Sequence, residues 1–126
     1  MNAEQHIKYL ELELAKSRAE AAQLRKKIGE KSRHARRIQK AYEDALLLAM
    51  WWTSGIIPSR SYTKRQGMSQ NRFQNATALL KMGRVIVRHR HWAIKDLAII
   101  EQRLASARQR SLDDPELFFL RHPRHR

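Results

Sequence analysis

Apolar side chains recur every three to four positions over the first 45 residues. With Ile7 as the first a position of a heptad, the a positions are Ile7, Leu14, Ala21, Ile28, Ala35 and Tyr42, and the d positions are Leu10, Ser17, Leu24, Lys31, Ile38 and Ala45. No proline interrupts residues 1–57, and most residues there favour helix. The pattern predicts one long helix with a coiled-coil seam.

A seam this narrow needs a partner helix, because an isolated helix is only marginally stable in water. The partner is either the same helix of a second subunit, parallel or antiparallel, or the C-terminal helix folded back. We expect a homodimer whose contacts are Ile7, Leu10, Leu14, Leu24 and Ile28. Ser17 and Lys31 weaken the seam and the small a positions admit a higher oligomer, so the oligomeric order stays open.

Beyond this helix the pattern changes twice. An apolar run over residues 45–52 ends near Gly55 and is expected to support a small domain, with Trp51 and Trp52 in its core rather than on a stacking surface. Helical spacing returns over residues 95–110, and Pro115 begins a short apolar turn. Residues 121–126 form a basic tail.

The centre of the chain carries one motif. Thr63 lies four residues before Gly67, and the residues that follow suit a helix corner: Met68, Ser69, Phe73 and Ala76. A small side chain lets two helices cross closely, glycine permits a positive φ, and serine caps the next helix. Residues 59–76 thus resemble the helix-turn-helix of bacterial and phage DNA-binding proteins, although Gln66 stands where that family usually has an apolar residue.

The resemblance implies a recognition helix over residues 69–82. After Gly83, the residues Val85, Ile86 and Val87 look like the exit into the first strand of a winged helix. Residues 88–91 lack the Gly, Asn or Asp that a tight hairpin prefers. A two-stranded wing and a continuous basic loop therefore both remain open.

The fold class expected is mainly α. Residues 1–44 would form the coiled-coil helix, residues 45–95 a small helix-turn-helix or winged-helix domain, and residues 96–126 a C-terminal helix, short turn and tail.

The charge distribution indicates a polyanionic partner. The formal net charge is +14, and the 51 residues between Asp44 and Asp96 contain no carboxylate, where about six would be usual. A surface facing the phosphates of DNA or RNA would exclude acids in this way. The resemblance to a helix-turn-helix is what favours duplex DNA over RNA. Residues 25–40 carry eight cations and a single acid. They form either a solvated flank or a further phosphate contact.

Two groups of residues follow from the recognition-helix hypothesis. Amide side chains can pair with adenine edges and a methyl group can contact thymine. The expected base-reading residues lie opposite Phe73 on a helical projection: Gln70, Asn71, Gln74, Ala78 and Lys81. The expected contacts to the DNA backbone are Arg60, Lys64, Arg65, Ser69, Arg72, Arg84, Arg88 and Arg90.

Other functions have less support. The chain has no cysteine, phosphate loop or triad spacing, and arginines beside His89 and His91 oppose a metal. We therefore expect no enzyme, no metal and no cofactor. The lack of an apolar span or signal-peptide order favours a cytoplasmic, nucleoid-associated protein without a membrane partner. The alternatives are an RNA-binding subunit of a ribonucleoprotein, ribosomal or CRISPR small-subunit in type, and a coiled-coil adaptor, which would leave the acid-free segment unexplained.

Overall fold

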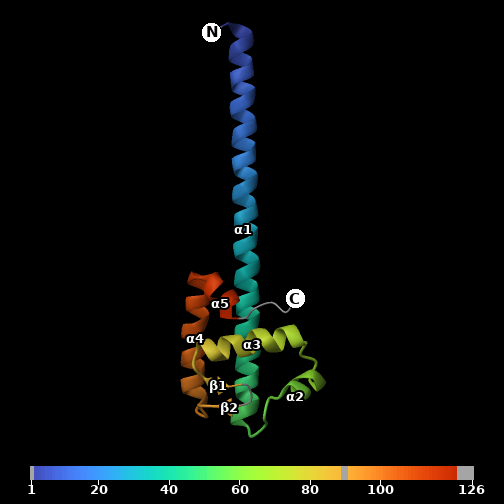
Figure 1. Cartoon of the computed structure of the whole chain (residues 1–126), viewed down its shortest axis with the longest axis vertical. Helices are drawn as coiled ribbons and strands as arrows, with labels where there is room; N and C mark the ends of the chain where they lie inside the picture. The colour runs from blue at the N-terminus through green and yellow to red at the C-terminus, as the bar shows by residue number, and fades with distance from the viewer. Residues whose placement is uncertain (1, 89–90, 122–126) are drawn as a thin grey trace. The chain divides into compact units, whose positions relative to one another are not determined.

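The computed structural model describes residues 2–88 and 91–121 and is mainly helical (Figure 1). In chain order the elements are α1 (Ala3–Thr53), α2 (Arg60–Arg65), α3 (Gln70–Met82), β1 (Ile86–Arg88), β2 (His91–Trp92), α4 (Leu97–Asp113) and α5 (Pro115–Arg121). The predicted long N-terminal helix and C-terminal helices are confirmed. The chain divides into two compact units, one ending at Arg33 and the other beginning at His34, and each is described by itself.

The first unit is the beginning of α1. Its seam residues are each more than half exposed: Ile7, Leu10, Leu14, Leu24 and Ile28. The face of α4 that could have served as their partner is used elsewhere, because Ile100, Leu104 and Ala107 are buried in the core of the second unit. This leaves the seam as an apolar stripe on a charged helix.

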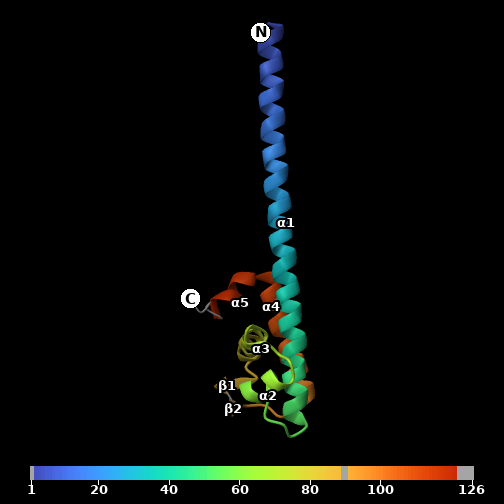
Figure 2. The same cartoon turned by 90° about the vertical axis from the view of Figure 1, so that its right-hand side faces the viewer.

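The second unit is built around the last turns of α1. Figure 1 shows α3 across these turns with α4 alongside them, and in Figure 2, turned by 90°, α3 is seen nearly end-on beside α1. The core is formed by Ile38, Ala45 and Leu48 of α1, together with side chains from α3, α4 and α5. Because Ile38 and Ala41 are buried there, this unit begins earlier than the boundary expected between residues 44 and 45.

Local signals in the sequence define the corner between α2 and α3. The side chains of Ser59 and Ser69 accept hydrogen bonds from the amides of Tyr62 and Arg72, so both predicted N-caps are confirmed. Gly67 has a φ of 87°, and its amide donates to the Lys64 carbonyl at 3.1 Å. This glycine ends α2 in the left-handed conformation that a side chain disfavours.

Met68 completes this corner. Its amide donates to the Thr63 carbonyl at 2.9 Å, and the two bonds together form a Schellman motif. The side chains of Met68 and Thr63 are both buried, so the corner packs inward as the motif predicts.

Two neighbouring residues shape the end of α3. The positive φ that ends the helix, 56°, belongs to Arg84 rather than to Gly83. Gly83 instead permits a close approach, because a Cβ there would lie 3.1 Å from the Arg103 carbonyl oxygen of α4.

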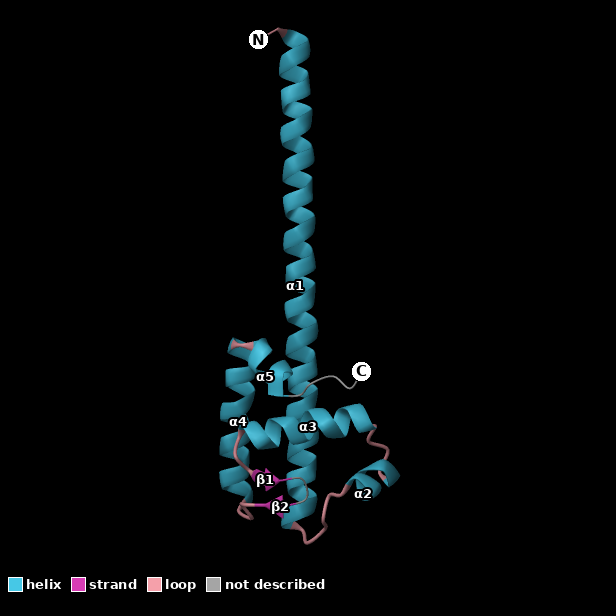
Figure 3. Cartoon of the chain, in the orientation of Figure 1, coloured by secondary structure: helices cyan, strands magenta, loops and turns pink. Residues whose placement is uncertain are grey.

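A two-stranded sheet follows α3. The strands β1 and β2 pair antiparallel, with Ile86 opposite Trp92 and Arg88 opposite His91 (Figure 3). The sequence left open either two paired strands or a continuous basic loop here. The structure has the paired strands.

Candidate nucleic-acid interface

Most of α3 is buried, which leaves a narrow exposed surface. Gln70, Asn71 and Lys81 are exposed and Gln74 is half-buried, as expected of outward-facing residues. The prediction for Ala78 is wrong, because it is 5% exposed and belongs to the core. The cause is that α2, α4, α5 and β1 all pack on α3, so the helix has less free surface than an isolated projection suggests.

The free surface is a single row of polar side chains. Gln70, Gln74, Thr77 and Lys81 are spaced at i, i+4, i+7 and i+11 and stay within an arc of about 60°. We call these four residues the α3 polar stripe. Thr77 is not among the residues expected to read bases, although the same spacing could have identified it. Asn71 lies beside the stripe in the first turn of α3.

Arg72 was predicted to contact the DNA backbone, but its guanidinium is bound within the fold. Its guanidinium forms two hydrogen bonds with the Asp44 carboxylate, at 2.9 and 3.0 Å. The bonds to Asp44 raise the pKa of Arg72 above its ordinary value, against the opposing effect of partial burial. Arg72 therefore joins α3 to α1, and its main role is in the fold.

Arg60 also serves the fold. Its guanidinium donates to the Met68 carbonyl oxygen at 3.0 Å and lies 5.8 Å from the centre of the Phe73 ring. These contacts cross the corner between α2 and α3. The Ser69 hydroxyl is likewise engaged as the cap of α3. Both residues were expected at the DNA backbone, and the structure shows each first as a support of this corner.

Four of the cations expected to contact DNA are exposed. Lys64 and Arg65 end α2, Lys81 belongs to the α3 polar stripe, and Arg84 follows α3. The backbone of Arg88 lies in β1, whereas Arg90 and His89 fall outside the described residues. Among the described residues, the exposed cations expected to contact DNA therefore lie on α2 and toward the end of α3.

The tryptophans support the sheet. Trp52 stacks on Trp92 with ring centres 5.4 Å apart, and its Nε1 donates to the Ile94 carbonyl at 3.0 Å. Trp51 meets Tyr62 edge to face at 5.1 Å. Both are partly buried against the core, as predicted, and connect the end of α1 to α2 and β2.

Comparison with protein-family models, with curated proteins and with solved structures gave no match. No group of three metal-binding side chains occurs among residues 2–88 and 91–121. Nor does that part of the chain contain a helix with the length and apolar character needed to cross a bilayer.

Proposed function

We propose that the second unit is a DNA-binding helix-turn-helix domain in which α3 is the recognition helix and β1 and β2 form a wing. The single observation that carries this proposal is the corner at Gly67, with a capped helix on each side and a polar stripe on the second helix. Such a corner presents the second helix to the major groove in helix-turn-helix proteins. The chain would act as a transcription regulator or as an accessory protein of a phage or mobile element.

The charges around α3 favour this function. Asp44 is the carboxylate nearest in sequence before the acid-free segment, and it is 2% exposed and paired with Arg72. Its charge is therefore neutralised inside the fold and is not presented to solvent. The exposed cations Lys64 and Arg65 lie just before the start of α3, where they can contact phosphates on either side of a groove.

Base reading belongs to the first turns of α3 in this proposal. Gln70, Asn71 and Gln74 carry amides that can donate and accept at a base edge. Lys81 lies at the other end of the α3 polar stripe and is suited to a phosphate or to guanine. Ala78 has no part in reading, because its methyl group is buried.

The first unit would bring two such domains together. Its five seam residues expose apolar side chains on a helix whose other positions are mostly charged or polar. Pairing of two copies along this stripe would bury those side chains and make the protein a homodimer. A dimer would place two copies of α3 on DNA and favour a two-part site.

The experiment is a binding selection from random duplex DNA at near-physiological salt, followed by titrations of the selected site. We expect a preferred site, and a plot of log K against log salt with a slope of roughly −4 to −7 if five to eight phosphates are neutralised. Duplex and single-stranded RNA of the same sequence are the controls. Equal or tighter binding to RNA, or a slope shallower than about −2, would replace this proposal with a ribonucleoprotein subunit or a protein adaptor.

A further inference from the structure

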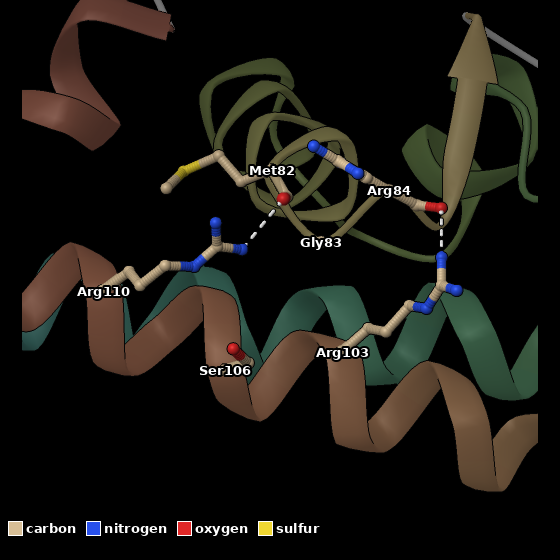
Figure 4. A pocket seen from close by; sticks show the side chains of 6 residues that line it. All are labelled: Met82, Gly83, Arg84, Arg103, Ser106 and Arg110. Carbon is tan, nitrogen blue, oxygen red and sulfur yellow. Dashed lines mark hydrogen bonds between the residues drawn. The ribbon is translucent and has the colours of Figure 1, made fainter.

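A pocket of about 440 Å³ lies between the end of α3 and the middle of α4 (Figure 4). It is lined by Met82, Gly83, Arg84, Arg103, Ser106 and Arg110. Three of the six are arginines and none is acidic. Arg103, Ser106 and Arg110 are spaced at i, i+3 and i+7, so they share one face of α4.

Two of these arginines are held in place by the backbone of the α3 terminus. Arg110 Nη2 donates to the Met82 carbonyl oxygen at 3.0 Å, and Arg103 Nη1 donates to the Arg84 carbonyl oxygen at 3.2 Å. A guanidinium has five N–H groups, so each retains donors after this bond. The positions of both side chains are thus set in advance of any ligand.

The third arginine is held at a conformational cost. Arg84 has a φ of 56°, a conformation that only glycine adopts freely. Glycine is the usual residue at this position of a helix end. An arginine here places a third positive charge at the pocket, although the charges repel one another and the backbone is strained. A bound anion would offset that repulsion.

We propose that this pocket binds a phosphate group, with Arg84, Arg103, Arg110 and the Ser106 hydroxyl as its ligands. Arginine forks match the oxygens of a phosphate, and serine supplies one further donor. The volume exceeds what phosphate alone fills, which leaves room for the sugar attached to it. The phosphate is either a diester of a DNA strand or the monoester of a free nucleotide.

The direct test is isothermal titration calorimetry of the full chain with inorganic phosphate and with a nucleoside monophosphate, at constant ionic strength without DNA. We expect one saturable site per chain. Arg84→Gly should weaken binding at least about tenfold, while the ligand-free protein melts at a higher temperature because the strain is relieved. Loss of binding in this variant therefore cannot come from unfolding.

Two further variants complete this test. Ser106→Ala changes an exposed side chain and should weaken binding by roughly threefold to tenfold. Lys16→Ala removes an exposed charge from the first unit and should leave binding unchanged. Absence of saturable binding in the unmodified protein overturns the proposal. Binding by both Arg84→Gly and Ser106→Ala that is as tight as that of the unmodified protein overturns it as well.

A second arm identifies the source of the phosphate. If a DNA strand occupies the pocket, the monophosphate competes with duplex and Arg84→Gly weakens duplex binding as well. If the ligand is a free nucleotide, the monophosphate binds the protein–DNA complex with unchanged stoichiometry. The phosphate proposal does not rest on DNA binding, because the calorimetry without DNA decides it even if the proposed function fails.

Discussion

Arg72 in α3 and Asp44 in α1 form a bidentate ion pair that joins the two helices. Nε and Nη2 of Arg72 donate to Oδ2 and Oδ1 of Asp44 at 3.0 and 2.9 Å, while the Asp44 side chain is only 3% exposed. Lys40 approaches the same carboxylate at 3.6 Å from the exposed side of α1. The pair fixes where α3 crosses α1, and the orientation of the α3 polar stripe follows from it.

Replacing Arg72 by alanine should lower the free energy of unfolding by about 2 kcal/mol, because a buried carboxylate loses its main partner. The loss is smaller than for a fully buried pair, since the Arg72 side chain is 38% exposed and Lys40 remains. Urea unfolding followed by circular dichroism measures it. Arg65→Ala, an exposed arginine of α2, is the control and should change stability by less than about 0.5 kcal/mol. Equal effects of the two variants would contradict a structural role for the pair.

The same pair predicts how stability responds to alkaline pH. The pKa of Arg72 is raised in the folded state by its bonds to Asp44, so its contribution is complete below the unfolded pKa and is lost only as pH rises through the higher folded value. Stability from this pair should therefore stay constant from neutral to moderately alkaline pH. Unfolding of the Arg72→Lys variant over the same range is the comparison, because a lysine titrates at lower pH than an arginine.

Two glycines should respond to alanine in opposite directions. Gly67 has a φ of 87° and open space around it, so Gly67→Ala should cost about 1–2 kcal/mol from backbone strain alone. Gly29 lies within α1, also in open space, and Gly29→Ala should stabilise that helix by about 0.5–1 kcal/mol. Thermal melts of both variants measure the difference. A neutral Gly67→Ala would show that the corner does not need its left-handed residue.

The seam should determine the oligomeric state. Changing both Leu10 and Leu24 to aspartate places charges within it, and the protein should become monomeric by light scattering. Leu12 provides the matched control because it is 70% exposed and lies outside the a and d positions. Leu12→Asp should leave the mass of the dimer unchanged. An unchanged mass for the double variant would mean that the seam does not hold the subunits together.

Variants of the base-reading residues and of the phosphate-contacting residues should lose DNA affinity in different ways. Asn71→Ala or Gln74→Ala should cost about 1–3 kcal/mol on the selected site and relax the preference at one or two positions. Lys64→Ala or Arg65→Ala should weaken selected and random duplexes alike and reduce the salt slope by about one unit. Titration of both duplexes with all four variants measures this. Equal losses on both duplexes for Asn71→Ala and Gln74→Ala would mean that α3 does not read bases.

Local signals predicted much of this fold, because each depends on a few neighbouring residues. Serine caps at Ser59 and Ser69 and the turn at Gly67 could be placed from the order of residues alone. The end of α3 was placed correctly, but the positive φ falls on Arg84, one residue later than a rule based on glycine suggests.

The roles of the arginines could not be predicted in this way. Arg72 pairs with a residue 28 positions away, and Arg37 donates to the Asn75 side chain 38 positions away. A projection of one helix does not show partners on other helices, so it cannot tell which arginines are already engaged within the fold. The burial of Ala78 has the same origin, because it depends on which helices cover α3.

All three tryptophans lie in the second unit, at residues 51, 52 and 92, where Trp52 and Trp92 stack with their rings 16° from parallel. Tryptophan fluorescence, excited at wavelengths that tyrosine does not absorb, therefore gives no signal from the first 33 residues and reports on the contact between the end of α1 and β2. Far-ultraviolet circular dichroism, by contrast, observes every helix. Melting curves from the two signals will coincide only if both units unfold together. Comparing them therefore shows whether the protein unfolds as one cooperative system or as two.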